Sequence, residues 1–415
     1  MMASMASLRL LASAAVLLGS KVDALAPGPR GQRAIPALAQ VIDQKSLNVL
    51  PSVPPAVEFN ASSSPWIPQT FTSAGLVDKP FHIYDDAFLD ILGPNPTFTV
   101  IAQTPKDPIF HEAVVWYKPK DEVFFVQNAG NADAGTGLDK SAAIFKISLK
   151  EADAVKDLRN ATGKVKVTQI PSNPEIPNPN GAVQYKGKIL YAAEGQGPSK
   201  APALIVLNPI EPYNTTVLLN NYYGRQFNSL NDLGINPRNL DIYFTDPTYG
   251  ESNNFRPAPG LQTQVYRYND KTGAVTVAAD GFIMPNGITF SPDGKYVYIT
   301  DTGIWRHGLE LSNPSSIYRY SVLEDGTFEN RKTFAFVDIN IPDGVHCDSK
   351  GNVYAGVGDG VHVWSPSGTL LGKIYTGRTS ANFQFVGGGR VVIGGETQLF
   401  YATLAATGSL VESQL

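Results

Sequence analysis

Six short apolar segments of the chain each begin with a polar residue whose side chain carries oxygen acceptors. These leading residues are Glu112, Asn180, Asn231, Asn286, Asp343 and Asn382. Carboxylate and amide oxygens are the ligands that Ca²⁺ takes in proteins, and the two carboxylates would balance its charge. If folding brings the leading residues together, they form a site for a hard divalent cation.

Each leading residue also has a simpler explanation. Pro285-Asn286-Gly287 and Pro342-Asp343-Gly344 are triplets typical of turns, so each triplet alone favours a turn. Six polar side chains cannot all be buried at strand ends without partners, because an unpaired buried amide costs about 1–3 kcal/mol and a carboxylate more. A cation would supply that partner. We expect the ligands to be Glu112, Asn231, Asn286 and Asp343.

The ligand types indicate which cation is expected. Ca²⁺ is favoured, and Mg²⁺ or Mn²⁺ would also accept an all-oxygen set. Zinc is disfavoured because no leading residue is His or Cys.

The leading residues open six copies of one sequence module. Each copy continues with an apolar strand, a turn rich in Gly, Pro or Asp, a second apolar strand and a polar residue. These trailing residues are Asn128, Glu194, Asp246, Asp301, Asp359 and Glu396, each 14 to 16 residues after its leading residue. Hairpins of constant length separated by variable segments are typical of propeller blades. The sequence therefore predicts an all-β, six-bladed β-propeller. A pair of β-sandwiches is the alternative, but it gives no reason for the module.

The chain outside the modules predicts three segments. Residues 1–26 combine Arg9, an apolar run and small residues, which is the pattern of a secretory signal peptide, although a frayed helix is the alternative. Residues 27–96 are expected to form an extended arm packed on the propeller of residues 97–415. Within the propeller, residues 97–103 would supply a closing strand to the last blade. Sequons for N-glycosylation begin at Asn60, Asn160 and Asn214. We therefore expect a secreted protein.

Composition excludes several classes of protein. The 415 residues are 43% hydrophobic and 17% charged, which is typical of a globular chain. The net charge of −4 and the lack of a basic cluster argue against nucleic acid as a partner. No apolar run reaches the length of a membrane span, so a membrane partner is not expected. The single cysteine, Cys347, is expected to be a buried hydrophobe on a strand.

Four stretches of the chain resemble, in order, the serial motifs of the senescence-marker-protein/gluconolactonase family. They are HEAVVW, NSLNDLGI with IYFTDPTYG, PNGITFSPDGKYVYITDTG, and PDGVHCDSKGNVYAGVGDGVHVWSPSG. Within this family the chain is most similar to fungal lactonohydrolases that open aldonate lactones and D-pantolactone. The resemblance runs from about Lys45 to the C-terminus. It implies a six-bladed propeller with one catalytic divalent ion, usually calcium, in the mouth of the channel.

The resemblance also implies roles for individual residues. Glu112, Asn231, Asn286 and Asp343 match the metal ligands of the family, and Asp343 matches the residue often assigned as the base. Together with the secretion expected from the N-terminus, this predicts a secreted, calcium-dependent lactonase whose substrate is a small lactone. In that mechanism, the catalytic residues are Asp343 and Glu112. The residues expected to bind the substrate are Asn180, Asn382, Gln127, Glu194 and His346.

Two departures from the family leave the substrate open. The first motif reads Glu-Ala-Val-Val-Trp where many relatives have Glu-Gly-Pro-Val-Trp, and Ser229-Leu230 stands where some relatives carry a substrate-binding arginine. A paraoxonase-like arylesterase is one alternative function. A non-catalytic binding propeller with a structural ion is the other.

Overall fold

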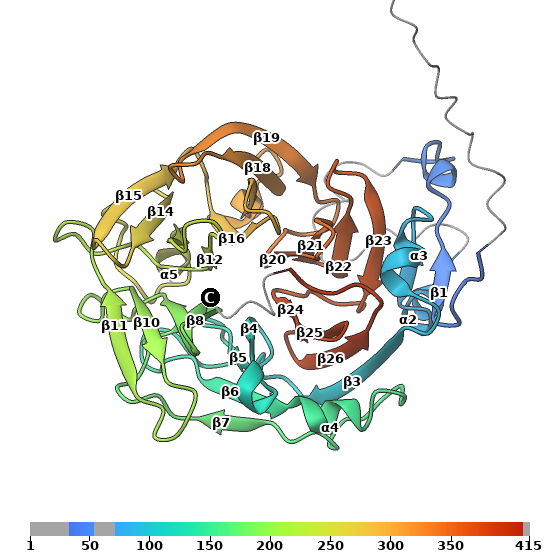
Figure 1. Cartoon of the computed structure of the whole chain (residues 1–415), viewed down its shortest axis with the longest axis horizontal. Coiled ribbons are helices and arrows are strands. Elements are labelled where there is room, and N and C mark those ends of the chain that lie inside the picture. The colour runs from blue at the N-terminus through green and yellow to red at the C-terminus, as the bar shows by residue number, and fades with distance from the viewer. Residues whose placement is uncertain (1–32, 54–70, 410–415) are drawn as a thin grey trace, which may run out of the picture. The chain divides into compact units, whose positions relative to one another are not determined.

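The described part of the chain folds as a six-bladed β-propeller around a central channel (Figure 1). The structure is a computed structural model that describes residues 33–53 and 71–409. The propeller lies within the compact unit that begins at Ile35. The predicted fold class is confirmed. The predicted signal peptide and the Asn60 sequon lie outside the described residues.

Each blade contains four antiparallel strands, ordered from the channel outward. The innermost strands are β4 (Glu112–Tyr117), β8 (Pro179–Tyr185), β12 (Leu233–Ile235), β16 (Pro285–Phe290), β20 (Val345–Cys347) and β24 (Phe383–Phe385). The second strands are β5 (Glu122–Val126), β9 (Lys188–Ala193), β13 (Ile242–Asp246), β17 (Tyr296–Asp301), β21 (Val353–Val357) and β25 (Arg390–Gly395). The six predicted hairpins are therefore the inner halves of blades 1 to 6.

The outer halves of the blades complete the sheets. The third strands are β6 (Ile144–Ser148), β10 (Ala203–Leu207), β14 (Gln264–Asn269), β18 (Ser316–Val322), β22 (Gly360–Trp364) and β26 (Gln398–Thr403). The fourth strands are β7 (Thr168–Ile170), β11 (Thr215–Leu219), β15 (Ala274–Ala279), β19 (Phe328–Phe336), β23 (Leu370–Tyr375) and β3 (Thr97–Gln103). Strand β3 pairs antiparallel with β26, with Thr97 opposite Thr403 and Gln103 opposite Gln398. The ring is thus closed by the predicted strand.

Two strands that precede the propeller extend blade 5. Strand β1 (Ala39–Val41) pairs in parallel with β2 (Phe81–Ile83), and β2 pairs antiparallel with β23. Gly372 of β23 allows the close approach of this segment, because a Cβ atom there would lie 2.3 Å from the ring of Phe88. The helical segments are η1 (Gln44–Leu47), α2 (Ser73–Asp78), α3 (Phe88–Leu92), η2 (Lys118–Lys120), α4 (Leu149–Asp153), α5 (Tyr249–Ser252) and η3 (Gly303–Trp305). None of the helices in the described ranges has the length and apolarity needed to span a bilayer.

The hydrophobic core lies between neighbouring blades. One cluster, for example, joins Phe124 of blade 1 to Ile189 and Tyr191 of blade 2, all fully buried. Full burial of such a side chain contributes about 1.5–3 kcal/mol, so each interface holds its two blades in a fixed orientation. Cys347 is buried in the cluster between blades 4 and 5, as predicted.

Blade 5 also buries a group of charges. The Lys373 Nζ atom of β23 lies 3.1 Å from Asp359 Oδ2, and the other carboxylate oxygen lies 2.6 Å from His362 Nε2. The side chains of Asp359 and Lys373 are 4% and 8% exposed. Lys373 lies opposite His82 of β2, so the segment before the propeller covers this ion pair.

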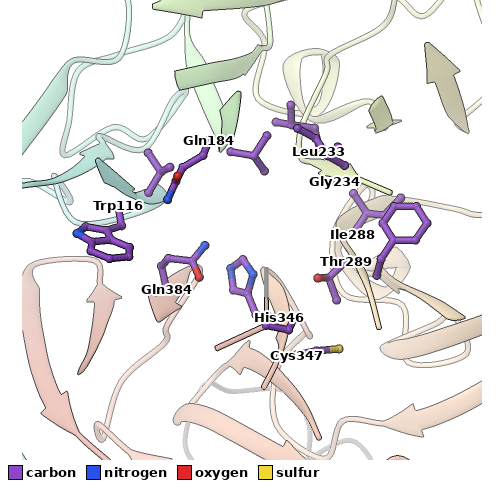
Figure 2. A pocket seen from close by; sticks show the side chains of 14 residues that line it. Trp116, Gln184, Leu233, Gly234, Ile288, Thr289, His346, Cys347 and Gln384 are labelled. Atoms are coloured by element: carbon purple, nitrogen blue, oxygen red, sulfur yellow. The ribbon is translucent and has the colours of Figure 1, made fainter. Parts of the chain in front are cut away.

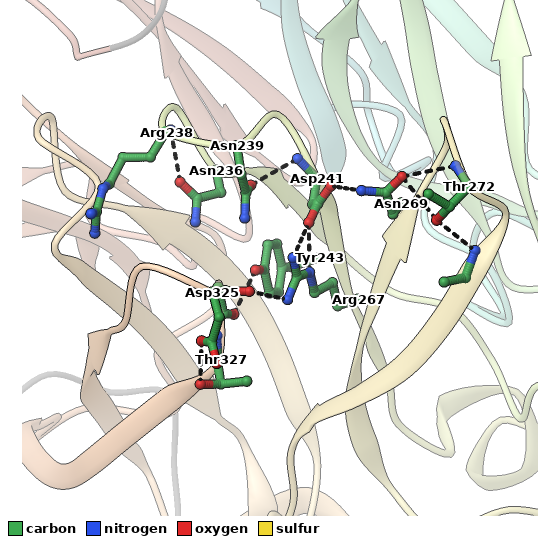
Figure 3. Close-up of polar contacts among 12 residues, drawn as sticks. Asn236, Arg238, Asn239, Asp241, Tyr243, Arg267, Asn269, Thr272, Asp325 and Thr327 are labelled. Atoms are coloured by element: carbon green, nitrogen blue, oxygen red, sulfur yellow. Dashed lines mark hydrogen bonds and ion pairs between the residues drawn. The ribbon is translucent and has the colours of Figure 1, made fainter.

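The turn between β12 and β13 shows what ordinary turn chemistry looks like in this chain (Figure 3). Asn236 Oδ1 accepts from the backbone N–H of Arg238, and Asn239 Oδ1 accepts from that of Asp241. The Asp241 carboxylate then pairs with Arg267 of β14, whose Nε atom lies 2.6 Å away. The oxygens of these side chains are occupied by protein donors. By contrast, five of the six leading residues have a side-chain oxygen without a protein donor.

Candidate functional site

The structure brings the six leading residues together at one mouth of the channel. Five of them line a cavity of about 160 Å³, namely Glu112, Asn180, Asn231, Asn286 and Asp343. The sixth, Asn382, lies beside it and donates through Nδ2 to Glu112 Oε2 at 2.7 Å. All six are buried, with at most 8% of each residue exposed.

The glycines that follow two of the leading residues explain how the ring packs so tightly. A Cβ atom at Gly287 would lie 2.4 Å from the Asp343 carbonyl oxygen, and one at Gly344 would lie 2.8 Å from Asn382 Nδ2. Neither glycine has a positive φ. The Asn-Gly and Asp-Gly pairs are therefore not left-handed turns. They let each inner strand approach the leading residue of the next blade.

Protein partners fix which end of the Asn180 and Asn286 amides faces the cavity. Asn286 Nδ2 lies 3.0 Å from the Tyr249 hydroxyl oxygen, to which it donates. Asn180 Nδ2 donates to Glu194 Oε1 at 2.8 Å, and Ser229 Oγ donates to the other oxygen of that carboxylate at 2.9 Å. With these nitrogens engaged, the amide oxygens of Asn286 and Asn180 are left as acceptors.

Five buried oxygens of the ring have no hydrogen-bond partner. They belong to the side chains of Asn180, Asn231, Asn286, Asp343 and Asn382, the Oδ1 atom in each case. A buried acceptor without a donor costs about 1–3 kcal/mol. Together with the Glu112 carboxylate they form a set of oxygen acceptors suited to a hard divalent cation. No cluster of three or more His, Cys, Asp and Glu side chains suited to a metal occurs in residues 33–53 and 71–409, because half of the predicted ligands are amides.

The two carboxylates of the ring are electrostatically strained without a cation. Burial raises the pKa of Glu112 well above its usual range, and the neighbouring Asp343 raises it further. Burial also raises the pKa of Asp343, to about 8. Two acidic groups in one desolvated cavity favour protonation, and a bound cation would favour the ionised forms instead.

A histidine at the rim carries positive charge. His111 Nδ1 lies 2.9 Å from Glu396 Oε1. Burial alone would lower the pKa of His111, but Glu396 outweighs it and raises the pKa to about 9. His111 is therefore protonated at neutral pH, beside Glu112 and in the lining of the cavity.

Several residues of the site were not predicted from the sequence. Tyr249 reaches the cavity from α5, and no spacing pattern connects it with Asn286. Asp232 is buried next to Asn231; its carboxylate accepts from the N–H of Leu233 at 2.8 Å and from that of Ile288 at 3.2 Å. The position of Asp232 beside a leading residue was the one signal that could have identified it.

Two predicted substrate-binding residues lie elsewhere. Gln127 does not line the mouth cavity. Its amide instead donates to Asp107 Oδ1 at 2.7 Å and accepts from the N–H of Ala143 at 3.3 Å. Because β5 ends at Val126, the following residue turns away from the mouth, and the trailing residue Asn128 lines the cavity in its place.

His346 lines a second cavity, of about 90 Å³, deeper in the channel. Figure 2 shows its ring with Gln184, Thr289, Gln384 and Trp116 around this space. Its ring packs edge-on against Phe383, the residue after the leading residue Asn382, with the ring centroids 5.1 Å apart.

The loops around the mouth differ in length between blades. In blades 1 to 4 the second and third strands are joined by residues 127–143, 194–202, 247–263 and 302–315. In blades 5 and 6 they are joined by residues 358–359 and 396–397. The long connections supply Tyr249 and Asn253 to the cavity lining, so one side of the mouth is more built up than the other.

Comparison with known proteins places these features in a family. The family model described as "SMP-30/Gluconolactonase/LRE-like region" matches residues 150–391. The lactonohydrolase oryL of Aspergillus oryzae is 30% identical over 377 residues, which cover 84% of this chain and 78% of that protein. The gluconolactonase of Zymomonas mobilis is 26% identical over 301 residues, which cover 70% and 74%.

A solved structure shares the fold. The gluconolactonase of Xanthomonas campestris superimposes with a TM-score of 0.60 at 24% identity, covering 78% of this chain and 94% of that one. At this identity the similarity shows the fold alone. The family match and the similarity to the Aspergillus protein show more: the chain belongs to the SMP-30/gluconolactonase family.

Proposed function

We propose that the chain is a lactonase that uses a divalent cation, Ca²⁺ in the first place, to hydrolyse aldonate-type lactones or D-pantolactone. The relatives named lactonohydrolase and gluconolactonase support hydrolysis of a lactone ester. The observation that supports the cation is the set of buried oxygens without donors on Asn231, Asn286 and Asp343, combined with the buried Glu112 carboxylate. The cation would be held by Glu112, Asn231, Asn286 and Asp343.

A bound divalent cation supplies Lewis-acid polarisation of the lactone carbonyl. The residues of the chain accept the proton and orient the ligands. Asp343 Oδ1 has no donor, so it can accept the proton of a water molecule that attacks the carbonyl carbon. The ring ester C–O bond then breaks, and the same proton passes from Asp343 to the leaving alkoxide oxygen to give the hydroxy acid. Asn382 holds the Glu112 carboxylate, and Tyr249 holds the Asn286 amide, so both ligands keep one orientation.

The lining of the mouth favours a hydroxylated substrate. Asn180 Oδ1 and Asn382 Oδ1 are free to accept hydrogen bonds from hydroxyl groups, and Glu194 fixes the first of these amides. Among the twelve residues that line the cavity, only Ala129 and Ile341 are aliphatic. An aryl ester would leave the polar oxygens without donors, which disfavours the arylesterase alternative.

A pH-stat screen of hydroxylated and aromatic lactones, with Ca²⁺ and after treatment with a chelator, tests this proposal. We expect turnover of hydroxylated lactones that the chelator abolishes and that added Ca²⁺ restores. Full activity in the metal-free protein would rule out the cation. Faster turnover of aryl esters would indicate an arylesterase. A lowered melting temperature on metal removal, with no turnover of any lactone, would indicate a binding propeller.

We also propose that the protein is secreted and carries N-glycans, as residues 1–26 and the sequons suggest. The asparagines at two sequons, Asn160 and Asn214, are exposed. We expect an endoglycosidase to reduce the mass of the secreted chain, and Asn160→Gln and Asn214→Gln each to remove part of that mass difference. A chain retained in the cells, with an unchanged mass, would contradict the proposal.

A further inference from the structure

Two Thr-Asp dipeptides end the second strands of blades 3 and 4. They are Thr245-Asp246 in β13 and Thr300-Asp301 in β17. All four residues are completely buried, at 0% exposure, yet none of them lines the mouth cavity. Burying a carboxylate is costly unless specific donors compensate for the lost water. The groups that donate hydrogen bonds to these two carboxylates indicate what the dipeptides do.

Asp246 hydrogen-bonds to the backbone just before Asn231, a proposed cation ligand. Its Oδ1 atom accepts from the N–H of Asn228 and from the N–H of Ser229, both at 2.9 Å. These two residues lie three and two positions before Asn231. The carboxylate thus fixes the segment from which the Asn231 side chain enters the cavity.

Asp301 makes the same contacts one blade further on. Its carboxylate accepts from the N–H of Ile283 at 3.0 Å and from that of Met284 at 2.9 Å. These residues lie three and two positions before Asn286, the same offsets as in blade 3. Asp301 Oδ1 also accepts from the N–H of Gly303 at 3.1 Å. The recurrence of the same two offsets in both blades argues against a chance interaction.

The threonines link each blade to the next. Thr245 Oγ1 donates to the Asn286 carbonyl oxygen at 2.8 Å. Thr300 Oγ1 donates to the Asp343 carbonyl oxygen at 3.0 Å. Each hydroxyl therefore holds the backbone of the leading residue in the following blade. Together the two dipeptides join the leading residues of blades 3, 4 and 5 into one series.

We propose that the two Thr-Asp dipeptides are positioning elements for the cation ligands of blades 3, 4 and 5. Each Asp fixes the ligand of its own blade, and each Thr fixes the ligand of the next blade. The inference rests on the proposed cation site. According to this inference, the relative positions of Asn231, Asn286 and Asp343 are set by residues that contact neither the cation nor the substrate.

The test is the affinity for Ca²⁺, measured by isothermal titration calorimetry on the full-length protein. We expect Asp246→Asn and Asp301→Asn each to weaken binding about 10- to 100-fold, the range found when residues that orient metal ligands are removed. Thr245→Val should weaken binding in the same direction, whereas Thr245→Ser keeps the hydroxyl and should bind nearly as well as the wild type. The Val and Ser pair keeps the test decisive if an Asp variant fails to fold.

Asp348→Asn is the matched control. Asp348 is 1% exposed and accepts from the N–H groups of Lys350 and Asn352, both at 2.9 Å, at the far end of the inner strand of blade 5. It should lower the melting temperature without changing the affinity for Ca²⁺. If the wild type binds Ca²⁺ and the Thr-Asp variants bind it equally well, the inference is wrong while the proposed function stands. If the wild type binds no Ca²⁺, the cation site itself is wrong and the inference falls with it.

Discussion

Asp343→Asn is expected to reduce lactone turnover by roughly 10²- to 10⁴-fold, the contribution that a positioned proton acceptor makes to a reaction. The amide keeps the shape of the carboxylate but cannot accept the proton of the attacking water. It also removes one of the two negative charges that the proposed cation needs. Turnover of a hydroxylated lactone in the pH-stat, at saturating Ca²⁺, measures the loss.

The same substitution should leave the metal-free protein at least as stable as the wild type. Burial raises the pKa of Asp343 because its charged form is desolvated, and an amide has no charge to desolvate. Thermal melting in the presence of a chelator checks this. A large loss of stability in metal-free Asp343→Asn would mean that the loss of activity reflects misfolding. A variant that keeps full turnover would exclude Asp343 as the base.

Asp359→Asn is expected to cause the largest loss of stability, about 3–5 kcal/mol, because it leaves Lys373 buried without its main partner. Denaturant unfolding at pH 7 measures the free energy of unfolding of both proteins. Asp338→Asn is the matched control. Asp338 lies 3.8 Å from the same Lys373 Nζ atom, but its side chain is 58% exposed, and removal of an exposed partner costs only about 0–1 kcal/mol. Equal losses in the two variants would contradict the prediction.

The pH dependence of this difference follows from the pKa of Asp359. Burial alone would raise that pKa, but Lys373 and His362 outweigh burial and hold it far below its usual range. A carboxyl group with a depressed pKa stabilises the fold above its unfolded pKa of about 3.9 and loses this contribution as the pH falls toward the folded value. The stability gap between wild type and Asp359→Asn should therefore be full at pH 7 and shrink below about pH 4. A gap that does not change with pH would show that the charge of Asp359 is not involved.

The inner hairpins could be predicted from the sequence, but of the outermost strands only the closing strand β3 could. The inner two strands of each blade are almost fully buried, and this produces the repeated apolar runs. Strand β19 (Phe328–Phe336) is mostly exposed, and β7 has only three residues, so neither carries a clear pattern. An edge strand owes its conformation to its neighbour in the sheet, which the local sequence does not reveal.

The placement of the leading residues could also be predicted, because a propeller superimposes equivalent positions of its repeats. The Tyr249 contact could not, since it depends on the path of the long connection after β13. Gln127 and His346 lie outside the lining of the mouth cavity, and their role in substrate binding stays a prediction. One residue along a chain in extended conformation reverses the direction of a side chain, so the sequence alone does not show whether Gln127 or Asn128 faces the cavity.

The closure of the ring has a consequence for the synthesis of the protein. Glu112 of the first blade accepts a hydrogen bond of 2.7 Å from Asn382 of the last blade. The closing strand β3, near the start of the propeller, pairs with β26, near its end. A nascent chain that has released only five blades from the ribosome has the Glu112 carboxylate but neither Asn382 nor a partner for β3. Its first blade therefore lacks the apolar neighbour that packs against it in the closed ring. The ring of leading residues is therefore expected to be complete only in a chain whose last blade has been translated.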